Sequence, residues 1–524
     1  MKLYRAFATV GGLTMISRVL GFVRDVLIAN VLGTGAIAEA FFAAFRLPNL
    51  FRRLFAEGAF NAAFVPLFSG HLERSGPEGA RAFAQEAIAA LLFVLLALTI
   101  VAQIAMPGLV YLMTPGFAQD PAKFDLTVLL SRITFPYLLC MSLVALFSGM
   151  LNALDRFIAA AAAPIILNIG LIGALVLGAL YLDTRTAGVV LAWGVALSGG
   201  LQLAVLAWAA QRQGMGLAIR WPRLTPGVKR LVTLGIPGVI SGGITQINLL
   251  IGTMIASLQA GAIAYLYYAD RIYQLPLGVV GIAIGIVLLP AISRQLRSGD
   301  FDGVADSQNR SVEFALLLTV PASIALLAVP DPIIRVLFEY GAFTAADTRA
   351  VADALAAFAI GLPAFVLIKV FSPAYFARED TRTPMIFAGV SVIVNIALSL
   401  MLFFGFQALG ISPHIGIAIG TTAAGWVNAV LLWATLVRRG HYRADAGLAR
   451  SLPRIALASV VMGSVVFGLA YLMGDLLAAG AHRGLQIAAL AGLVGAGIVV
   501  YAGLAHLTGA VHLPSLLRGR TRPA

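Results

Sequence analysis

An apolar stretch near the N-terminus carries more charge than a lipid-facing helix tolerates. It covers residues 39–66 and reads EAFFAAFRLPNLFRRLFAEGAFNAAFVP. On a helix, at about 100° per residue, four of its charged residues fall within roughly 40° of one another. They are Glu39, Arg46, Arg53 and Glu57, and the fifth, Arg52, is displaced from Arg53. An arginine at mid-membrane costs about 2.5–3.5 kcal/mol, so the stripe predicts carboxylate partners, a water-filled cavity or a place near the membrane surface.

Two interpretations of this stripe stay open. In the first, it is a structural ion-pair network in which Arg53 pairs with Glu57, one helical turn away. In the second, the helix lines a polar cavity and bends at Pro48, because proline lacks the N–H that a helix needs. A kinked, charged helix beside a cavity is our working hypothesis.

Nine basic residues lie inside apolar segments, and an anion is the ligand that suits them. Arginine binds a phosphoryl group through two parallel charge-assisted hydrogen bonds and stays protonated even when poorly solvated. The alternative for each arginine is a snorkelling anchor near a membrane surface. Four arginines on three predicted helices would form a ring able to hold a diphosphate: Arg18, Arg24, Arg52 and Arg271.

Other charged residues near this ring complete the candidate substrate-binding set. Asp25, Glu39 and Glu57 either neutralise the empty ring or carry a proton or cation, and the sequence does not decide between these roles. We predict no catalytic residue, metal site or cofactor, because the GxxxxGK[ST] phosphate loop and the paired Cys and His spacing of zinc sites are absent from the sequence. The remaining candidates are Arg53, Asp270 and Lys369.

The composition excludes a soluble domain. Of 524 residues, 60% are hydrophobic and 11% are charged, which predicts an all-α polytopic membrane protein. The net charge of +13 does not indicate nucleic acid, because the basic residues lie mainly in short loops between apolar segments. A single cysteine, Cys140, excludes a disulfide within the chain.

Apolar runs of about 20 residues or more predict about fourteen transmembrane helices, of which the second covers residues 36–68. On the side that holds the N-terminus, the loops and tails carry 23 Lys and Arg residues, among them Arg382. The loops on the opposite side carry 4, namely Lys123, Arg185, Arg349 and Arg483. Loops rich in Lys and Arg face the cytoplasm. Both termini are therefore predicted to be cytoplasmic, which an even number of helices also requires.

An internal repeat predicts two similar halves. The tetrapeptide GAIA occurs at residues 35–38 and 261–264, an offset of 226, and Asn168-Ile169 matches Asn395-Ile396 at an offset of 227. Each half holds six helices, so the halves enter the membrane in the same sense and are related by a pseudo-two-fold axis along the membrane normal. The predicted domains are an N-lobe (1–213), a C-lobe (214–440), and two additional helices with a basic cytoplasmic tail (441–524).

Three segments resemble the signatures of the MurJ/MviN family of lipid II flippases, in the superfamily that includes multidrug and polysaccharide exporters. They are SRVLGFVRD (17–25), RLPNLFRRLFAEGAFNAAFVP (46–66) and YYADRIYQLPLGVVGIAIGIVLLP (267–290). The resemblance runs over the whole chain. It places the family's essential basic residues on the same four arginines that form the predicted ring.

The resemblance implies a V-shaped bundle that works by alternating access through a central cavity. Its cargo would be lipid II, an undecaprenyl-diphosphate-linked disaccharide pentapeptide. The protein would carry it from the inner to the outer leaflet of the bacterial inner membrane for peptidoglycan synthesis. The two C-terminal helices would form a groove for the lipid tail. Lipid II and membrane lipids are the implied partners, with proteins of cell-wall synthesis or division as further candidates and no nucleic acid.

The sequence departs from the family pattern in two places. An acidic residue often follows the YADR motif in the family, and here that position is Gln274. A sodium site would need a carboxylate on the helices at 231–257 or 384–406, and neither has one, so coupling to the membrane potential fits better. The alternatives are a cation-coupled multidrug or polysaccharide-lipid exporter of the same superfamily, a membrane enzyme acting on polyprenyl diphosphates, and a scaffold of the division machinery.

Overall fold

A computed structural model describes residues 2–53, 61–216, 218 and 221–509. Within these ranges the secondary structure is helical and contains no strand, as predicted. Ten segments of this part of the chain are long and apolar enough to cross a membrane. Four predicted spans are not among these ten. They correspond to helices α1 (Lys2–Leu32), α2 (Ala36–Arg52), α8 (Pro226–Ala256) and α9 (Ala262–Arg297). The chain is a multi-pass membrane protein, and the predicted total of about fourteen spans is consistent with its helices.

The chain divides into two compact units. The first comprises Met1–Ala264 with Tyr340–Phe343, and the second comprises Tyr265–Glu339 with Thr344–Ala524. Helix α8 (Pro226–Ala256) therefore belongs to the first unit, where it packs against α3. The predicted lobes have a different boundary, between residues 213 and 214, because they are defined by the sequence repeat and not by contacts. This division into lobes stays a prediction.

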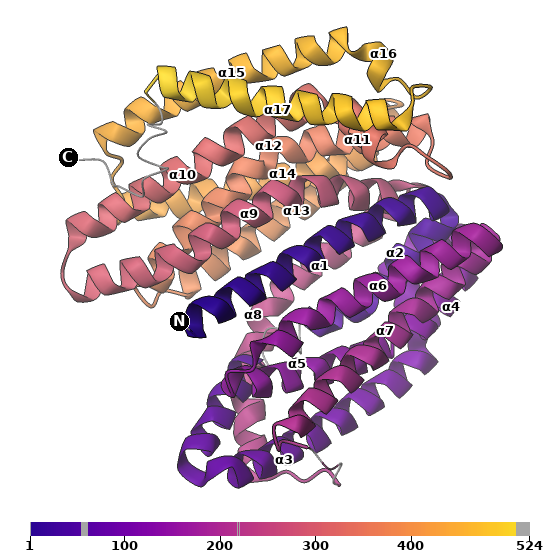
Figure 1. The fold of residues 1–524 in the computed structure, drawn as a ribbon, viewed down its shortest axis with the longest axis vertical. Helices are drawn as coiled ribbons and strands as arrows, with labels where there is room; N and C mark the ends of the chain where they lie inside the picture. Colours follow the sequence, from indigo (N-terminus) through magenta and orange to yellow (C-terminus); the bar gives the residue numbers. More distant parts are fainter. Residues whose placement is uncertain (1, 54–60, 217, 219–220, 510–524) are drawn as a thin grey trace. The chain divides into compact units, whose positions relative to one another are not determined.

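The first unit is built from eight α-helices and a short 3₁₀ helix among its described residues (Figure 1). Helix α1 lies along α6, and α6 lies along α7. Its core joins α3, α5 and α7, where Phe64 stacks on Phe68 and Phe83 with ring centres 5.6 and 5.8 Å away. The helices are α1 (Lys2–Leu32), α2 (Ala36–Arg52), α3 (Asn61–Met113), η2 (Pro115–Gln119), α4 (Pro121–Thr134), α5 (Tyr137–Ala153), α6 (Phe157–Tyr181), α7 (Thr184–Arg212) and α8.

The charged stretch at residues 39–66 is shared between two helices. Helix α2 ends at Arg52, which Arg53 follows as the C-cap, and α3 begins at Asn61. Pro48 lies buried inside α2. The prediction of one continuous helix over 36–68 falls partly on residues 54–60, which are outside the described part of the chain.

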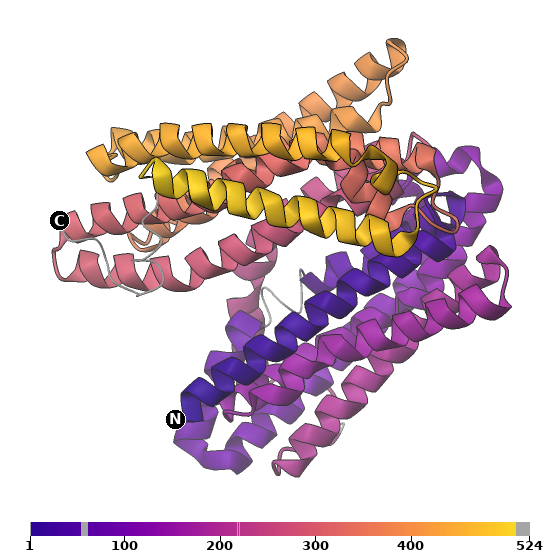
Figure 2. The same cartoon turned by 45° about the horizontal axis from the view of Figure 1, so that its top comes forward.

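The second unit holds the remaining helices, and its core lies between α9, α10, α12 and α14. The phenol of Tyr375 on α12 donates a hydrogen bond to the backbone oxygen of Leu432 on α14 over 2.7 Å. Helices α15 and α17 run side by side, and α15 packs on α10 (Figures 1 and 2). The helices are α9 (Ala262–Arg297), which starts at the end of the first unit, α10 (Phe301–Ala328), α11 (Pro330–Phe338), α12 (Ala345–Phe376), α13 (Arg382–Ala408), α14 (His414–Arg438), α15 (Ala446–Leu472), α16 (Gly474–Leu477) and α17 (Arg483–Leu507).

Helices at corresponding positions of the predicted repeat share local features. Helices α2 and α9 begin at Ala36 and Ala262, one residue after the glycine of each GAIA copy. A Cβ atom at Gly194 on α7 would lie 3.1 Å from the Cβ of Ala174 on α6. At Gly420 on α14, 226 residues later, it would lie 2.5 Å from the Oγ of Ser399 on α13. Both helix pairs approach closely because glycine has no side chain at these positions.

The turn between α12 and α13 is fixed by an aspartate. The hydroxyl and the backbone N–H of Thr383 donate to the carboxylate of Asp380 over 2.7 and 2.9 Å. Arg439, at the end of α14, contacts the same carboxylate at 2.7 Å. The hydrogen bonds from Thr383, followed by the contact with Arg439, lower the pKa of Asp380 to about 2. Asp380 is therefore charged at neutral pH, and this ion pair links the ends of α12, α13 and α14.

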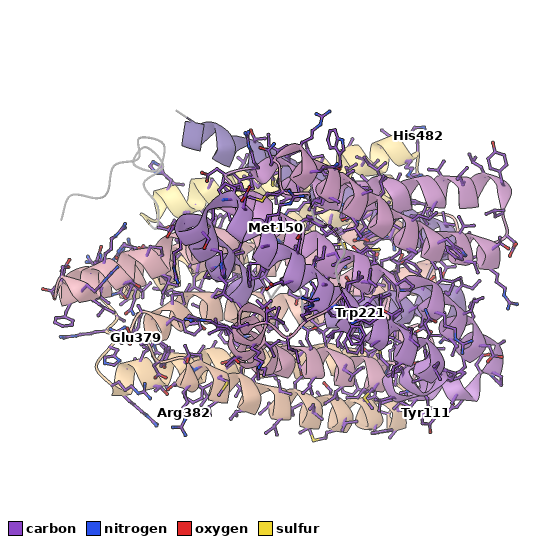
Figure 3. The ribbon with its side chains drawn as sticks, turned by 90° about the horizontal axis from the view of Figure 1, so that it is seen from below. Tyr111, Met150, Trp221, Glu379, Arg382 and His482 are labelled. Atoms are coloured by element: carbon purple, nitrogen blue, oxygen red, sulfur yellow. The ribbon has the colours of Figure 1, made fainter. Side chains whose placement is uncertain are left out.

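The two ends of the second unit are marked in Figure 3. Arg382, in the turn between α12 and α13, lies at one end, and His482, at the start of α17, lies at the other. The sequence assigns these two turns to opposite sides of the membrane. The arrangement within this unit is consistent with that assignment.

Candidate functional site

Arg24 and Asp25 form an ion pair in the C-terminal half of α1, where it meets α6. Two nitrogens of the Arg24 guanidinium, Nε and Nη2, donate to Oδ1 of Asp25 over 3.0 and 2.7 Å. The third nitrogen, Nη1, donates to Oδ1 of Asn168 on α6 over 2.9 Å. Only 11% of the Arg24 side chain and 3% of the Asp25 side chain are exposed. The structure thus brings together two of the predicted site residues and adds an uncharged third.

Asn168 orients the guanidinium of Arg24. Its Nδ2 donates to the backbone oxygen of Ser17 over 2.9 Å, which leaves its Oδ1 facing Arg24. A Cβ atom at Gly21 would lie 3.7 Å from the amide of Asn168, so α1 comes close to α6 here. In the sequence, Asn168 stands out only as a marker of the predicted repeat. The signal that could have identified it is an amide inside an otherwise apolar 25-residue helix.

The other predicted arginines of the first unit lie on α1 and at the end of α2. Arg18 is exposed on α1, six residues before Arg24. Arg52 is half-buried at the end of α2, where its Nε donates to Oδ1 of Asn49 over 3.2 Å. Arg53 is exposed at the C-cap of α2. Glu57 lies outside the described residues, so the interpretation in which it pairs with Arg53 stays untested.

Glu39 contacts a lysine that sequence analysis had placed in a loop. The Nζ of Lys123, in the first turn of α4, forms a short contact with Oε2 of Glu39, and the backbone N–H of Ile263 donates to Oε1 over 3.1 Å. The ammonium also lies 3.8 Å from the ring centre of Phe117. Both charged side chains are buried, at 7% and 1% exposure. Glu39 therefore joins α2, α4 and the start of α9, and no described contact connects it to Arg24.

Arg46 has a separate partner from the other charges of its stripe. Its guanidinium donates to the hydroxyl of Thr253 on α8. Of the predicted stripe, Glu39 and Arg46 lie inside α2, and they bind different neighbouring helices. These two side chains contact protein groups rather than lipid, as the cost of inserting a charge requires.

The predicted site residues of the second unit lie on α9 and α12. The guanidinium of Arg271 donates to the phenol of Tyr267 over 3.1 Å and lies 4.6 Å from the centre of its ring. Asp270 accepts a hydrogen bond from the amide of Gln274. An amide at position 274 can donate to this carboxylate, which an ionised acidic residue there could not do. Lys369 is exposed, and its stem packs on Gly281.

The described side chains suit an anion better than a metal ion. No three His, Cys, Asp or Glu residues gather as metal ligands in the part of the chain that the structure describes. Arg24 is held in place by Asp25 and Asn168, so a guanidinium is pre-oriented inside an apolar helix bundle. Such a group binds a phosphoryl oxygen at a small cost in conformational entropy.

Comparison with known proteins identifies the family. The family profile described as "Lipid II flippase MurJ" matches residues 28–482. A "Probable lipid II flippase MurJ" from Rhizobium meliloti (strain 1021) is 51% identical over 527 residues, which cover 100% of this chain and 97% of that protein. This chain belongs to the MurJ family. A further relative, the "Lipid II flippase MurJ" of Burkholderia cenocepacia, is 34% identical over 471 residues and covers 89% of this chain and 90% of that protein.

Solved structures agree with membership of the MurJ family. One titled "Lipid II flippase MurJ, inward closed conformation" superimposes with a TM-score of 0.77 at 26% identity, covering 95% of this chain and 98% of that one. An inward-facing multidrug resistance MATE family transporter of the MOP superfamily superimposes with a TM-score of 0.66 at 14% identity, covering 83% of this chain and 98% of that one. The match to the MATE transporter shows a shared fold, and it covers only part of this chain.

Proposed function

We propose that this chain is a transporter that moves lipid II from the inner to the outer leaflet, and that it is not an enzyme. Its support is the match to relatives named as lipid II flippases along the full chain. The observation within the structure that carries the proposal is the Arg24 guanidinium, held by Asp25 and Asn168 among apolar helices. A lipid-linked diphosphate is a substrate that needs both an anion site and an apolar environment.

In the proposed mechanism, Arg18, Arg24, Arg52 and Arg271 bind the diphosphate during alternating access. Arg24 supplies the pre-oriented group. Arg271 adds a guanidinium stacked on Tyr267. Asp25 keeps Arg24 in position while the site is empty, because the carboxylate neutralises its charge. The head group carries negative charge, and moving one unneutralised charge across the membrane is worth about 2.3 kcal/mol per 100 mV. Transport is therefore coupled to the membrane potential.

The test of this function is a leaflet-accessibility assay for lipid II. The chain is expressed in cells depleted of their own lipid II flippases, and lipid II in the outer leaflet is measured. We expect accessible lipid II to be restored by the wild-type chain and to remain low with Arg271→Ala. Restored drug efflux without outer-leaflet lipid II would instead identify the chain as a drug exporter of the same superfamily, which the shared MATE fold allows.

We further propose that the chain lies in the bacterial inner membrane with both termini in the cytoplasm. The excess of Lys and Arg on the N-terminal side supports this orientation. In a variant with Cys140→Ser, a cysteine at Arg185 should react with an impermeant thiol reagent in spheroplasts. One at Arg212 should be shielded until the membrane is made permeable. The reverse labelling pattern would overturn the orientation and the direction of transport.

A further inference from the structure

A second basic site lies at one end of the first unit, apart from the Arg24 pair. It is a pocket of about 440 Å³ where α1, α5, α6 and α7 meet. Its walls are mainly apolar and include Leu151, Phe157 and Ile158. Two arginines, Arg156 and Arg212, line it as well. The pocket therefore combines guanidinium groups with a surface suited to hydrocarbon.

The turn between α5 and α6 fixes the position of Arg156. Helix α5 ends at Ala153, and Asp155 in the turn that follows adopts the left-handed conformation, at φ 59°. The N–H of Arg156 then donates to the backbone oxygen of Leu151 over 2.8 Å, which closes the end of the helix. Arg156 follows as the N-cap of α6, whose N-terminus has no side-chain cap. The positive end of the α6 dipole thus lies at the pocket and adds to the charge of the arginines.

Arg212 is fixed by an aromatic side chain. It lies in the last turn of α7, and its guanidinium carbon is 4.0 Å from the ring centre of Trp208. Tryptophan concentrates at membrane–water interfaces, where its apolar ring and polar N–H are both accommodated. Trp208 and Ile158 are exposed, at 54% and 64%. The pocket consequently opens where apolar surface and basic groups adjoin.

We propose that this pocket binds the phosphate of an anionic phospholipid in the leaflet on the N-terminal side. The two arginines would hold the phosphate, and the apolar walls would pack against the glycerol and the first part of an acyl chain. Asp155 also lines the pocket, and its single negative charge leaves the site net positive. This site would hold a resident lipid and requires no transport step, so it goes beyond the proposed function and can fail separately from it.

Titration of the purified full-length chain in neutral detergent tests the proposal. The probes are dioctanoyl phosphatidylglycerol, dioctanoyl phosphatidylcholine and inorganic phosphate, with binding followed by native mass spectrometry. We expect the anionic lipid to bind the wild type at least tenfold more tightly than the other two probes. Arg156→Gln and Arg212→Gln should each weaken it about tenfold, the equivalent of one charge-assisted hydrogen bond.

Two matched variants serve as controls. Arg185→Gln removes an exposed arginine from the other end of α7 and should leave lipid binding unchanged. Asp155→Asn removes the opposing charge and should keep or strengthen it, since asparagine tolerates the left-handed conformation. Equal binding of the two lipids, equal binding of inorganic phosphate, or wild-type affinity in Arg156→Gln/Arg212→Gln would each overturn the proposal.

Discussion

Replacing Arg24 and Asp25 together with alanine is expected to give a folded protein that no longer moves lipid II. Arg24→Ala alone removes the guanidinium from a carboxylate whose side chain is 3% exposed, and breaking a buried pair costs about 3–5 kcal/mol. The double variant removes both charges, so most of this loss in unfolding free energy should be recovered. Transport should not recover, because the diphosphate of lipid II has lost the Arg24 guanidinium that is proposed to bind it. Arg24→Lys keeps the charge but loses the planar guanidinium that donates two parallel hydrogen bonds. Its transport activity should fall between those of the wild type and Arg24→Ala.

The measurements are thermal unfolding in detergent and outer-leaflet lipid II in depleted cells. Loss of the phosphate contact corresponds to about 1.5–3 kcal/mol, or roughly ten- to a hundredfold in affinity. If Arg24 and Asp25 only stabilise the fold, then transport should return together with stability in the double variant. That result would reject the anion-binding role of Arg24.

Asn168 allows orientation to be tested separately from charge, because the repeat supplies a matched control. Asn168→Ala removes the amide that holds Arg24, so transport should fall while the charge stays in place. Asn395, its counterpart on α13, accepts hydrogen bonds from the hydroxyls of Ser399 and Thr421 over 3.1 and 3.3 Å. Asn395→Ala should lower stability by a similar amount, about 1 kcal/mol, and leave transport closer to wild type. Equal loss of transport in both variants would contradict an orienting role.

The sequence predicted the helices and the charged positions better than the contacts between them. A span of about 20 apolar residues is a local property, so segments such as α6 and α13 can be recognised without their neighbours. The angles on a helix also placed Glu39 and Arg46 on one face of α2. They could not show which helix that face meets. The partner of Glu39 is Lys123, which is 84 residues away in the sequence. In the sequence, Lys123 served only as one of the loop charges that indicate topology.

The uncharged members of the site were the hardest to predict. A charge in an apolar run is conspicuous because its burial is costly, which is why Arg24 and Asp25 were candidates from the start. An amide costs less to bury than a charge, because it can form hydrogen bonds between membrane helices. The role of Asn168 follows only from its distance to Arg24 and from the backbone of Ser17 that fixes its orientation. Such a contact depends on how α1 packs on α6, which periodicity does not specify.

The buried pair of Glu39 and Lys123 is expected to show the strongest coupling in stability. Lys123→Met leaves a carboxylate that is 1% exposed without its ammonium, and Glu39→Gln leaves the ammonium without its carboxylate. Each single change should cost about 3–5 kcal/mol. The double variant should lie much closer to wild type, because glutamine still accepts the hydrogen bond from Ile263 and methionine still packs on Phe117. Asp306→Asn is the control, since its contact with Arg310 at 3.4 Å is exposed and should be worth less than about 1 kcal/mol.

The same double variant tests whether Glu39 belongs to the predicted substrate-binding set or only stabilises the fold. Thermal unfolding gives the coupling energy, and the leaflet assay gives transport for each protein. A stable Glu39→Gln/Lys123→Met protein that still moves lipid II would mean that this pair joins α2, α4 and the start of α9 and takes no part in substrate binding. A stable protein without transport would return Glu39 to the substrate-binding set. If the double variant lost as much stability as the two single variants together, the two charges would not stabilise one another. Their mutual burial argues against that result.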